Sequence, residues 1–526
     1  MRRWNGWGEE SVRYELPRHA EAYLAERLGW GKRHRDVRLE EVSPPVSRLP
    51  EHRLVSRERL ERILHGRGQS FPDLVALRTG RIGVLPDGVA FPTTEEEVAD
   101  LLSYARRVGA RVIPRGGGTS VVGGVNPQQG DEPVLALSLE RMWRLKDLDE
   151  KGLLATFGSG VRGPWLEAQV RGFGYTLGHY PQSFEYSTLG GWIATRSSGQ
   201  QSLGYGRIED VFRGGRVLTP VGPLSLPPFP ASAAGPDLRH LVLGSEGRLG
   251  IITEAVVRVR PVPEEERFWG VVFPTWEAGL EALREIVQQG VPLSMLRLSD
   301  PEETRSQLAL ALSPRVRRLF EELLARRGVG GEKSLLILAA TGTPQMVKEA
   351  RSQSRAIVRG HGGVVIGEVA GREWRKRRFR LPYLRDSLWE SGWATDTIET
   401  ATTWSDLAPT ARAVLEALRL ALGQERVVAM VHASHVYPTG AALYFTFLFR
   451  LASAPDATLE RWRRLRAAAV KVFLDRGATL THHHGIGSDL APYLIREKGR
   501  TGIAMLEAIA KTADPTGMMN PGKLIP

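Results

Sequence analysis

Val112-Ile113-Pro114-Arg115-Gly116-Gly117-Gly118-Thr119-Ser120-Val121-Val122-Gly123-Gly124 is the stretch that decides the fold. A β-branched run leads into it and predicts a buried strand, which Pro114 ends because proline has no N–H to donate. The three glycines that follow lack side chains, so successive backbone N–H groups can turn towards one anion. Thr119 and Ser120 add hydroxyl donors. We therefore predict a loop that holds a pyrophosphate, with an ordinary tight turn as the alternative.

Two more glycine-rich stretches follow, Gly178 to Gly206 and Gly244 to Thr253. Both are rich in small and hydroxyl side chains, at a density that a packed core does not need. Three such stretches within one domain indicate one extended cofactor that is contacted repeatedly. None of them matches a Walker A loop or a Rossmann Gly-x-Gly-x-x-Gly motif, so neither common nucleotide-binding fold is indicated.

Composition narrows the class of protein. A length of 526 residues predicts two or three domains. The absence of cysteine excludes disulfides, thiol catalysis and thiolate metal sites. A formal net charge of +12 favours acidic partners such as phosphorylated metabolites, anionic lipid or nucleic acid, while an arginine-rich thermophile composition is an equally weighted alternative. Neither a secretory signal nor a membrane-spanning apolar run is evident, so we expect a cytoplasmic protein.

The order of elements predicts an α+β protein of four parts. Residues 1–85 form a helical N-terminal extension, and residues 86–263 form the cofactor-binding domain. Residues 264–475 form a substrate-binding cap domain. Residues 476–526 form a C-terminal segment that carries a histidine cluster and returns to the cofactor-binding domain.

These stretches, with Trp4-Asn5-Gly6-Trp7-Gly8, Tyr383-Leu384-Arg385-Asp386 and His482–Gly487, resemble the flavoproteins of the vanillyl-alcohol oxidase fold. Within that superfamily the chain most resembles the alkyldihydroxyacetonephosphate synthase family. The resemblance implies a PCMH-type FAD-binding domain of two α+β subdomains, with a cap domain whose mainly antiparallel sheet is covered by helices. In several relatives the flavin is tethered through a histidine in the glycine loop or through a cysteine. Thr119 stands at that loop position here, so we predict non-covalent FAD.

The resemblance also implies which residues bind FAD. They belong to the glycine loop and to three later segments: Pro114, Arg115, Gly116, Gly117, Gly118, Thr119 and Ser120; Gln182, Ser183, Phe184, Glu185, Tyr186, Ser187 and Thr188; Thr195, Arg196, Ser197 and Ser198; Glu246, Gly247, Arg248, Leu249, Gly250, Ile251 and Ile252.

Three residues match substrate-site positions of the family. Arg385 matches its phosphate-binding arginine, and a guanidinium suits a phosphate bidentately. The alternative is a surface salt bridge to Asp386. Arg297 matches an arginine near flavin or substrate. Tyr437 matches the tyrosine that takes a proton from the substrate; because the ordinary phenol pKa is about 10, this role needs nearby positive charge from Arg385 or a histidine. A half-buried, hydrogen-bonded tyrosine is the alternative.

His482, His483 and His484 are the remaining catalytic candidates, which we expect to polarise substrate oxygens. If they form a strand, successive side chains point to opposite faces and cannot all reach one ion. A related group of hydroxy-acid dehydrogenases binds metal through a segment whose counterpart here, His435–Leu443, lacks the acid and the second histidine. We therefore expect no metal. The basic run Gly371–Arg380 is expected to be a solvated helix face near the substrate entrance, with membrane contact as the alternative.

The family resemblance implies ether-lipid synthesis. The acyl group of acyl-dihydroxyacetone phosphate is exchanged for a fatty alcohol through a flavin N5 adduct, without net oxidation. However, the segment Glu399–Trp404 keeps only the ends of a family segment and replaces its centre, and the tail Asp514–Lys523 looks more like 2-hydroxy-acid dehydrogenases. An FAD-dependent dehydrogenase or oxidase of D-lactate, glycolate or 2-hydroxyglutarate is therefore the alternative. We expect a homodimer, with peripheral membrane contact kept open and no nucleic-acid partner.

Overall fold

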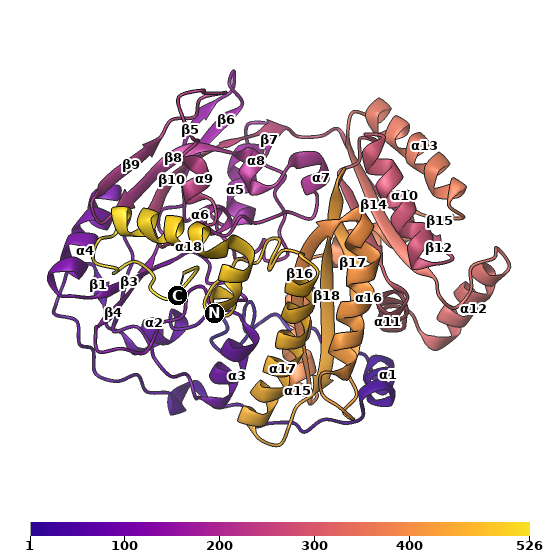
Figure 1. Cartoon of the computed structure of the whole chain (residues 1–526), viewed down its shortest axis with the longest axis horizontal. Coiled ribbons are helices and arrows are strands. Elements are labelled where there is room, and N and C mark those ends of the chain that lie inside the picture. The colour runs from indigo at the N-terminus through magenta and orange to yellow at the C-terminus, as the bar shows by residue number, and fades with distance from the viewer. Residues whose placement is uncertain (1, 526) are drawn as a thin grey trace.

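In the computed structural model, which describes residues 2–525, the glycine loop follows a strand of a small sheet (Figure 1). The sheet has the order β1-β2-β4-β3, with β2, β4 and β3 parallel. Its strands are β1 (Val55–Ser56), β2 (Gly88–Ala90), β3 (Arg111–Arg115) and β4 (Val134–Ser138). Helix α4 (Glu95–Arg107) connects β2 to β3 and is capped by Thr94, whose side chain accepts a hydrogen bond from the Glu97 N–H. The loop therefore begins at the carboxyl end of a buried parallel strand.

A second, antiparallel sheet lies beside the other glycine-rich segments. Its order is β5-β6-β10-β8-β9, with strands β5 (Leu145–Asp149), β6 (Leu154–Gly158), β8 (Phe212–Thr219), β9 (Gly222–Leu226) and β10 (Ile251–Arg258). Short helices lie beside it: α5 (Gly163–Arg171), α6 (Leu189–Ala194), α7 (Ser202–Tyr205), α8 (Ile208–Val211) and α9 (Arg239–Val242). The two α+β subdomains meet along the glycine loop.

The cap domain is built on a seven-stranded sheet with only antiparallel pairs among the described residues. Its order is β15-β12-β14-β13-β17-β18-β16, with strands β12 (Glu265–Phe273), β13 (Met295–Ser299), β14 (Ser334–Gly342), β15 (Val364–Gly367), β16 (Trp393–Thr403), β17 (Val428–Tyr437) and β18 (Gly440–Arg450). One face packs against α10 (Trp276–Gln288), α13 (Pro344–Gly360), α16 (Trp404–Leu420) and α17 (Pro455–Asp475). This confirms the expected fold class. The opposite face packs in part against α1 (Arg18–Leu28), α14 (Glu368–Arg377) and α15 (Leu381–Glu390), and its open part lines a cavity.

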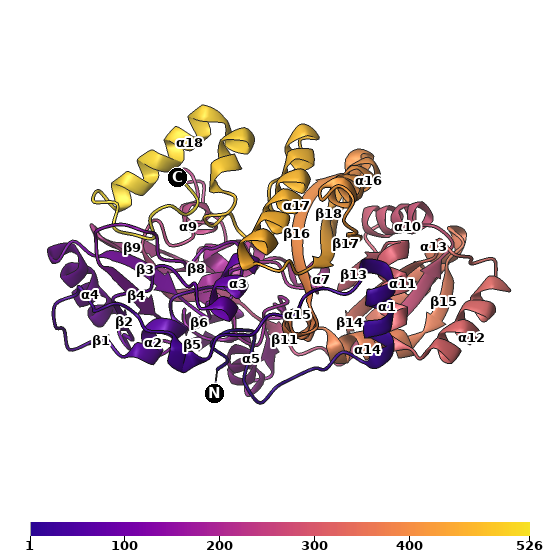
Figure 2. The ribbon, with the colours of Figure 1, turned by 90° about the horizontal axis from the view of Figure 1, so that it is seen from below.

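Both ends of the chain pack back onto the body. Helix α1 (Arg18–Leu28) packs on the cap, whereas α18 (Leu494–Ala513) lies over the FAD-binding domain (Figure 2). Near the C-terminus, the Val112 N–H donates to the Met518 carbonyl and the Asn520 N–H donates to the Val112 carbonyl, both at 2.8 Å. The tail thus adds a short parallel bridge to β3.

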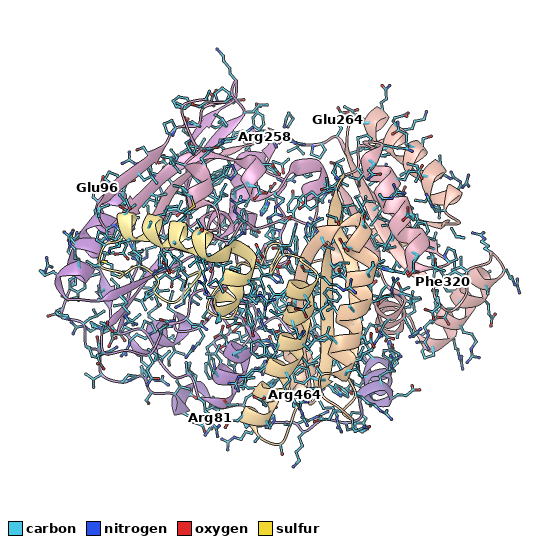
Figure 3. All side chains as sticks on the ribbon, in the orientation of Figure 1. Arg81, Glu96, Arg258, Glu264, Phe320 and Arg464 are labelled. Carbon is cyan, nitrogen blue, oxygen red and sulfur yellow. The ribbon has the colours of Figure 1, made fainter. Side chains whose placement is uncertain are left out.

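The outer surface carries much of the charge. Figure 3 shows Arg81, Glu96 and Arg464 at the periphery, and Arg81 forms an exposed ion pair with Asp456 at 3.0 Å. Within residues 2–525, none of the helices combines the length and the apolar character that crossing a membrane requires.

Candidate active site

One cavity of about 930 Å³ lies between the FAD-binding domain and the open face of the cap sheet. Most of the predicted FAD-binding residues line it: Pro114, Arg115, Gly116, Gly117, Gly118, Thr119, Ser120, Gln182, Ser183, Ser187, Thr188, Thr195, Ser197, Ser198, Glu246, Gly247, Gly250 and Ile252. The three glycine-rich segments therefore converge on a single groove.

The glycine loop has the donors that a pyrophosphate needs. None of the N–H groups of residues 116–120 donates a hydrogen bond to another residue in the described range 2–525. A Cβ on Gly117 would lie 1.8 Å from the Tyr186 carbonyl oxygen, so glycine permits this close packing. The Arg2 guanidinium donates to the Gly117 carbonyl at 2.8 Å and brings positive charge to the loop. A row of unpaired donors beside a cation fits the diphosphate of FAD.

Seven predicted FAD-binding residues are absent from the cavity wall: Phe184, Glu185, Tyr186, Arg196, Arg248, Leu249 and Ile251. Two of them bind other parts of the chain. Arg196 forms an ion pair with Glu209 at 2.9 Å, and Arg248 donates to the Met519 carbonyl at 2.7 Å. These residues hold the segments that carry the lining residues.

Asn520 is a cavity residue that the sequence reasoning missed. Its side-chain amide donates to the carbonyls of Gly124 at 3.0 Å and Glu246 at 2.7 Å. The buried carboxylate of Glu246 in turn accepts from the N–H groups of Ile486 and Gly487. Burial raises the pKa of Glu246 to about 7, against the effect of these two donors. The tail Asp514–Lys523, which the sequence analysis noted as unlike the family pattern, was the sequence signal that could have pointed to Asn520.

Arg385 lies in the cavity wall and is held by Gln69. Its two terminal nitrogens donate to the Gln69 main-chain oxygen and to Oε1, at 2.6 and 3.0 Å. Its Nε is buried and makes no hydrogen bond to any residue that the structure describes. Asp386 does not pair with Arg385; it binds Arg78 at 2.8 Å and Arg3 at 3.1 Å. The alternative of an Arg385–Asp386 surface pair is therefore wrong, and Arg385 is one of the residues that line the cavity.

Arg297 also lines the cavity, but a carboxylate opposes its charge. Its guanidinium donates to Glu303 Oε1 at 2.6 Å and to Ser299 Oγ at 2.9 Å. Burial raises the pKa of Glu303, but the charges of Arg297 and His432 outweigh it and lower that pKa to about 2. Arg385, which has no carboxylate partner among residues 2–525, is the better anion ligand of the two.

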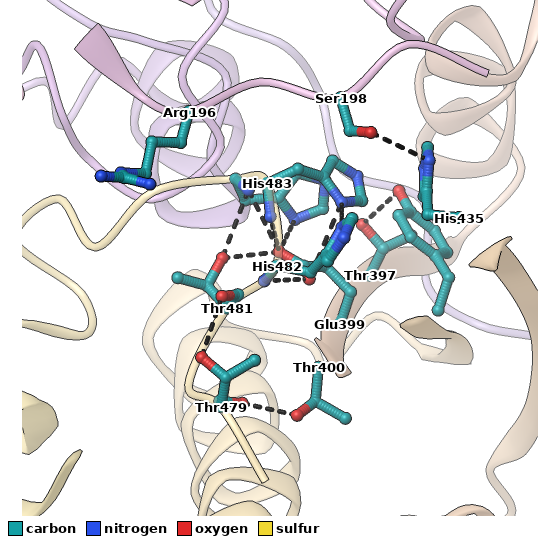
Figure 4. Close-up of polar contacts among 12 residues, drawn as sticks. Arg196, Ser198, Thr397, Glu399, Thr400, His435, Thr479, Thr481, His482 and His483 are labelled. Atoms are coloured by element: carbon teal, nitrogen blue, oxygen red, sulfur yellow. Dashed lines mark hydrogen bonds and ion pairs between the residues drawn. The ribbon is translucent and has the colours of Figure 1, made fainter. Parts of the chain in front are cut away.

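The histidine cluster does not form a strand. Its backbone wraps around the buried carboxylate of Glu399, which accepts from the N–H groups of His482, His483 and His484 at 2.5, 3.2 and 3.1 Å (Figure 4). This winding places the Nδ1 atoms of His482 and His483 only 2.9 Å apart. The expectation of opposite faces is therefore wrong here. His483 and His484 line the cavity, together with His435.

Tyr437, the last residue of β17, lies one layer behind that wall. Its hydroxyl is 2.6 Å from His482 Nε2 and 3.2 Å from the Arg207 guanidinium, and neither Tyr437 nor His482 lines the cavity. Burial raises the pKa of Tyr437, and the charge of Arg207 opposes that rise. The positive charge that Tyr437 needs is therefore supplied by Arg207, not by Arg385. The sequence analysis did not single out Arg207, because the neighbouring residues Gly206 and Ile208 form no recognisable motif with it.

His435, His482 and His483 offer a possible metal-ligand set. Each presents one nitrogen, and these three atoms lie within 4.8 Å of one another. Three imidazoles suit zinc-like ions. However, an Arg207 nitrogen lies 2.8 Å from His482 Nε2 and would repel a cation. The expectation of no metal stays a prediction.

The cavity continues into an apolar arm beneath the cap sheet. This arm runs between α1, α11 (Pro301–Ala311), α12 (Pro314–Ala325), α14 (Glu368–Arg377) and α15 (Leu381–Glu390). Its lining includes Leu16, Leu24, Leu308, Leu312, Val316, Phe320, Leu335, Val369, Trp374, Leu381, Leu384, Met430 and Leu448. An arm of this composition suits a hydrocarbon chain. The basic run predicted near the entrance forms α14 and the turn after it, and Arg377 and Arg378 line the same cavity.

Comparisons with known proteins agree with this geometry. Residues 86–225 match the family described as FAD binding domain, and residues 262–524 match FAD linked oxidases, C-terminal domain. The chain is 32% identical to an alkyldihydroxyacetonephosphate synthase of Trypanosoma brucei brucei, covering 100% of this chain and 92% of that protein. It is 33% identical to one of Dictyostelium discoideum, covering 89% and 78%. The chain belongs to the alkyldihydroxyacetonephosphate synthase family.

A solved structure of an alkyldihydroxyacetonephosphate synthase has the same fold, with a TM-score of 0.87 at 27% identity over 99% of both chains. Membership of the alkyldihydroxyacetonephosphate synthase family confirms FAD as the cofactor and the protein as an FAD-dependent enzyme. The glycine loop, with its unpaired N–H groups, lies within the residues that match the FAD binding domain family.

Proposed function

We propose that this enzyme exchanges the acyl group of acyl-dihydroxyacetone phosphate for a fatty alcohol. The observation that carries the proposal is the continuity of one cavity, which joins the FAD groove, the Arg385 guanidinium and the apolar arm. A substrate with a phosphate, a polar reacting carbon and a long hydrocarbon chain matches these three regions in turn. The names of the full-length relatives support the same assignment.

Each region has a distinct task in this reaction. Arg385 binds the phosphate, because it lines the cavity, its guanidinium is oriented by Gln69, and no carboxylate within residues 2–525 pairs with it. His483 and His484, whose backbones are fixed by Glu399, face the reacting oxygens. FAD supplies the isoalloxazine ring on which the exchange depends. The apolar arm excludes water and holds the departing or entering chain.

The direct test uses the purified holoenzyme, palmitoyl-dihydroxyacetone phosphate and radiolabelled hexadecanol. Formation of labelled alkyl-dihydroxyacetone phosphate with release of palmitate is the expected result. An anaerobic screen with D-lactate, glycolate and 2-hydroxyglutarate addresses the dehydrogenase alternative. Flavin bleaching by one of these acids, without alkyl product, would overturn the proposal.

We also propose that the enzyme works in the cytoplasm at an anionic membrane surface, as a homodimer. Helix α12 supports the membrane contact, because Val316, Leu319 and Leu323 are 52, 60 and 51% exposed on a helix that also carries several arginines. Phe320 of the same helix lies at the edge of the molecule (Figure 3) and lines the apolar arm. Light scattering of the eluting protein tests the homodimer.

A further inference from the structure

Tyr437, His482 and His483 form a connected row from the protein interior to the cavity. The Tyr437 hydroxyl is 2.6 Å from His482 Nε2, and His482 Nδ1 is 2.9 Å from His483 Nδ1. Only His483 of these three lines the cavity. A proton that passes between Tyr437 and a ligand therefore has to cross both imidazole rings.

Arg207 determines which way this row is polarised. A guanidinium has only N–H donors, and one of its nitrogens lies 2.8 Å from His482 Nε2. Nε2 is therefore the bare nitrogen of His482 and Nδ1 carries the proton. Nδ1–H then donates to His483 Nδ1, which leaves the proton of His483 on Nε2. Among the described residues, no acceptor receives a hydrogen bond from His483 Nε2, and this atom is not fully buried.

The position of Arg207 is itself well fixed. One nitrogen donates to the main-chain oxygens of Arg196 and His482, both at 3.0 Å. Its Nε lies 3.4 Å from a carboxylate oxygen of Glu209. The same guanidinium is 3.2 Å from the Tyr437 oxygen, so it can also stabilise a phenolate there.

We propose that Tyr437, His482 and His483 form a proton relay whose polarity is set by Arg207, with His483 as the end that exchanges a proton with the ligand. This inference deepens the proposed function and rests on it for the identity of the ligand. Arg207 is a positioning residue, whereas His483 is the catalytic residue.

The proton count balances over one exchange. The phenol proton of Tyr437 moves to His482 Nε2, the Nδ1 proton of His482 moves to His483 Nδ1, and the Nε2 proton of His483 moves to the departing carboxylate oxygen. An O–H bond forms on the fatty acid and a phenolate remains beside Arg207. The hydroxyl proton of the entering alcohol returns along the same row, so the relay ends as it began.

The electrostatics of the cluster suit this role. Burial, with the neighbouring positive groups, lowers the pKa of both His482 and His483 well below the usual value, so both rings are neutral near pH 7. A neutral imidazole has one protonated and one bare nitrogen, as each step of the relay requires. Stacking of His435 on His482, with ring centroids 5.0 Å apart, keeps the rings aligned.

The first test reads the phenol directly and needs no turnover. The holoenzyme is labelled with 3-fluorotyrosine, and the ¹⁹F signal of Tyr437 is assigned with Tyr437→Phe and followed against pH. We expect Arg207→Gln to raise the pKa of this phenol by about one to three units, because a neighbouring cation is lost. Arg207→Lys should retain most of the wild-type pKa. Arg258→Gln, a change in a half-buried arginine of β10, is the matched control and should leave the signal unchanged.

The second test asks whether the protons move together. In mixtures of H₂O and D₂O, the rate of the wild-type exchange should depend non-linearly on the deuterium fraction, since several protons are transferred in the same step. His483→Gln should lower kcat at least tenfold with little change in KM.

A Tyr437 titration that is unaffected in both Arg207 variants would overturn the relay, as would a linear deuterium dependence. One equivalent of zinc-like metal on the cluster, measured by elemental analysis, would overturn it too. The NMR result stands even if the synthase activity is not found.

Discussion

Gln69 holds the Arg385 guanidinium through two hydrogen bonds, 2.6 Å to its main-chain oxygen and 3.0 Å to its side-chain oxygen. Arg385→Met should lower kcat/KM for the phosphorylated substrate by about ten- to a hundredfold, because a hydrogen bond to a charged group contributes about 1.5–3 kcal/mol. Steady-state kinetics measures this loss, with Arg412→Met, a surface arginine of α16, as the control. Equal losses in both variants would contradict the assignment.

The predicted attachment of FAD is non-covalent. Precipitation of the holoenzyme with acid should release all of the yellow flavin into the supernatant, since Thr119 cannot tether it and the chain contains no cysteine. Colour that stays with the pellet would contradict this prediction.

Gly117→Ala should prevent FAD binding, because the added Cβ would lie 1.8 Å from the Tyr186 carbonyl oxygen. Flavin absorbance per chain measures the effect. Gly330→Ala is the matched control, since its Cβ would meet no atom within 4 Å. Full flavin content in Gly117→Ala would show that the loop can yield without losing its function.

Asp300 should make stability depend on pH. Burial raises the pKa of this N-cap carboxyl to about 7, so the folded protein keeps a proton that the unfolded chain loses near pH 4. Stability from this group therefore falls as the pH rises from 4 to 7. Asp300→Asn keeps a good cap and removes the titration. Its Tm relative to wild type should thus increase between pH 5 and pH 8, measured by calorimetry; a constant Tm difference would contradict the buried acid.

Docking of α12 on a membrane is tested by sedimentation with vesicles. Wild type should bind vesicles that contain anionic lipid more strongly than neutral ones, and added salt should weaken the binding. Leu319→Glu combined with Leu323→Glu should abolish binding, because both side chains are exposed on α12. Leu420→Glu, at an exposed site on α16, is the control. Equal sedimentation of both variants would place the contact elsewhere.

Local signals predicted the glycine loop and its neighbours well. The Thr94 cap, the acidic first turn of α4 and the Gly116–Gly118 run each lie within a few residues of sequence. The structure has β3 directly before the glycine loop, as expected, and the strand runs one residue past Pro114. By contrast, the composition of residues 393–403 did not predict a strand. These residues form β16 because they pair with β18 along their whole length. Ser313 precedes Pro314 at the start of α12, yet its side chain makes no capping hydrogen bond.

The deeper layer of the active site could not be predicted, because its contacts join residues far apart in the chain. Arg207 meets Tyr437 230 residues later, and Gln69 meets Arg385 316 residues later. The sequence left the conformation of the histidine cluster open, and the Glu399 carboxylate from β16 decides its winding. Arg385, His483 and His484 were found through the family resemblance, whereas Arg207 and Gln69 required the fold.

The two ends of the chain meet at the same strand and loop, with Arg2 on the Gly117 carbonyl and Met518 and Asn520 on Val112. During synthesis, Met518 and Asn520 leave the ribosome long after Val112. A nascent chain therefore lacks part of the cradle for its coenzyme, however early its first domain folds. The earlier-made segments alone therefore form an incomplete groove, and closing it joins the first and the last described parts of the chain.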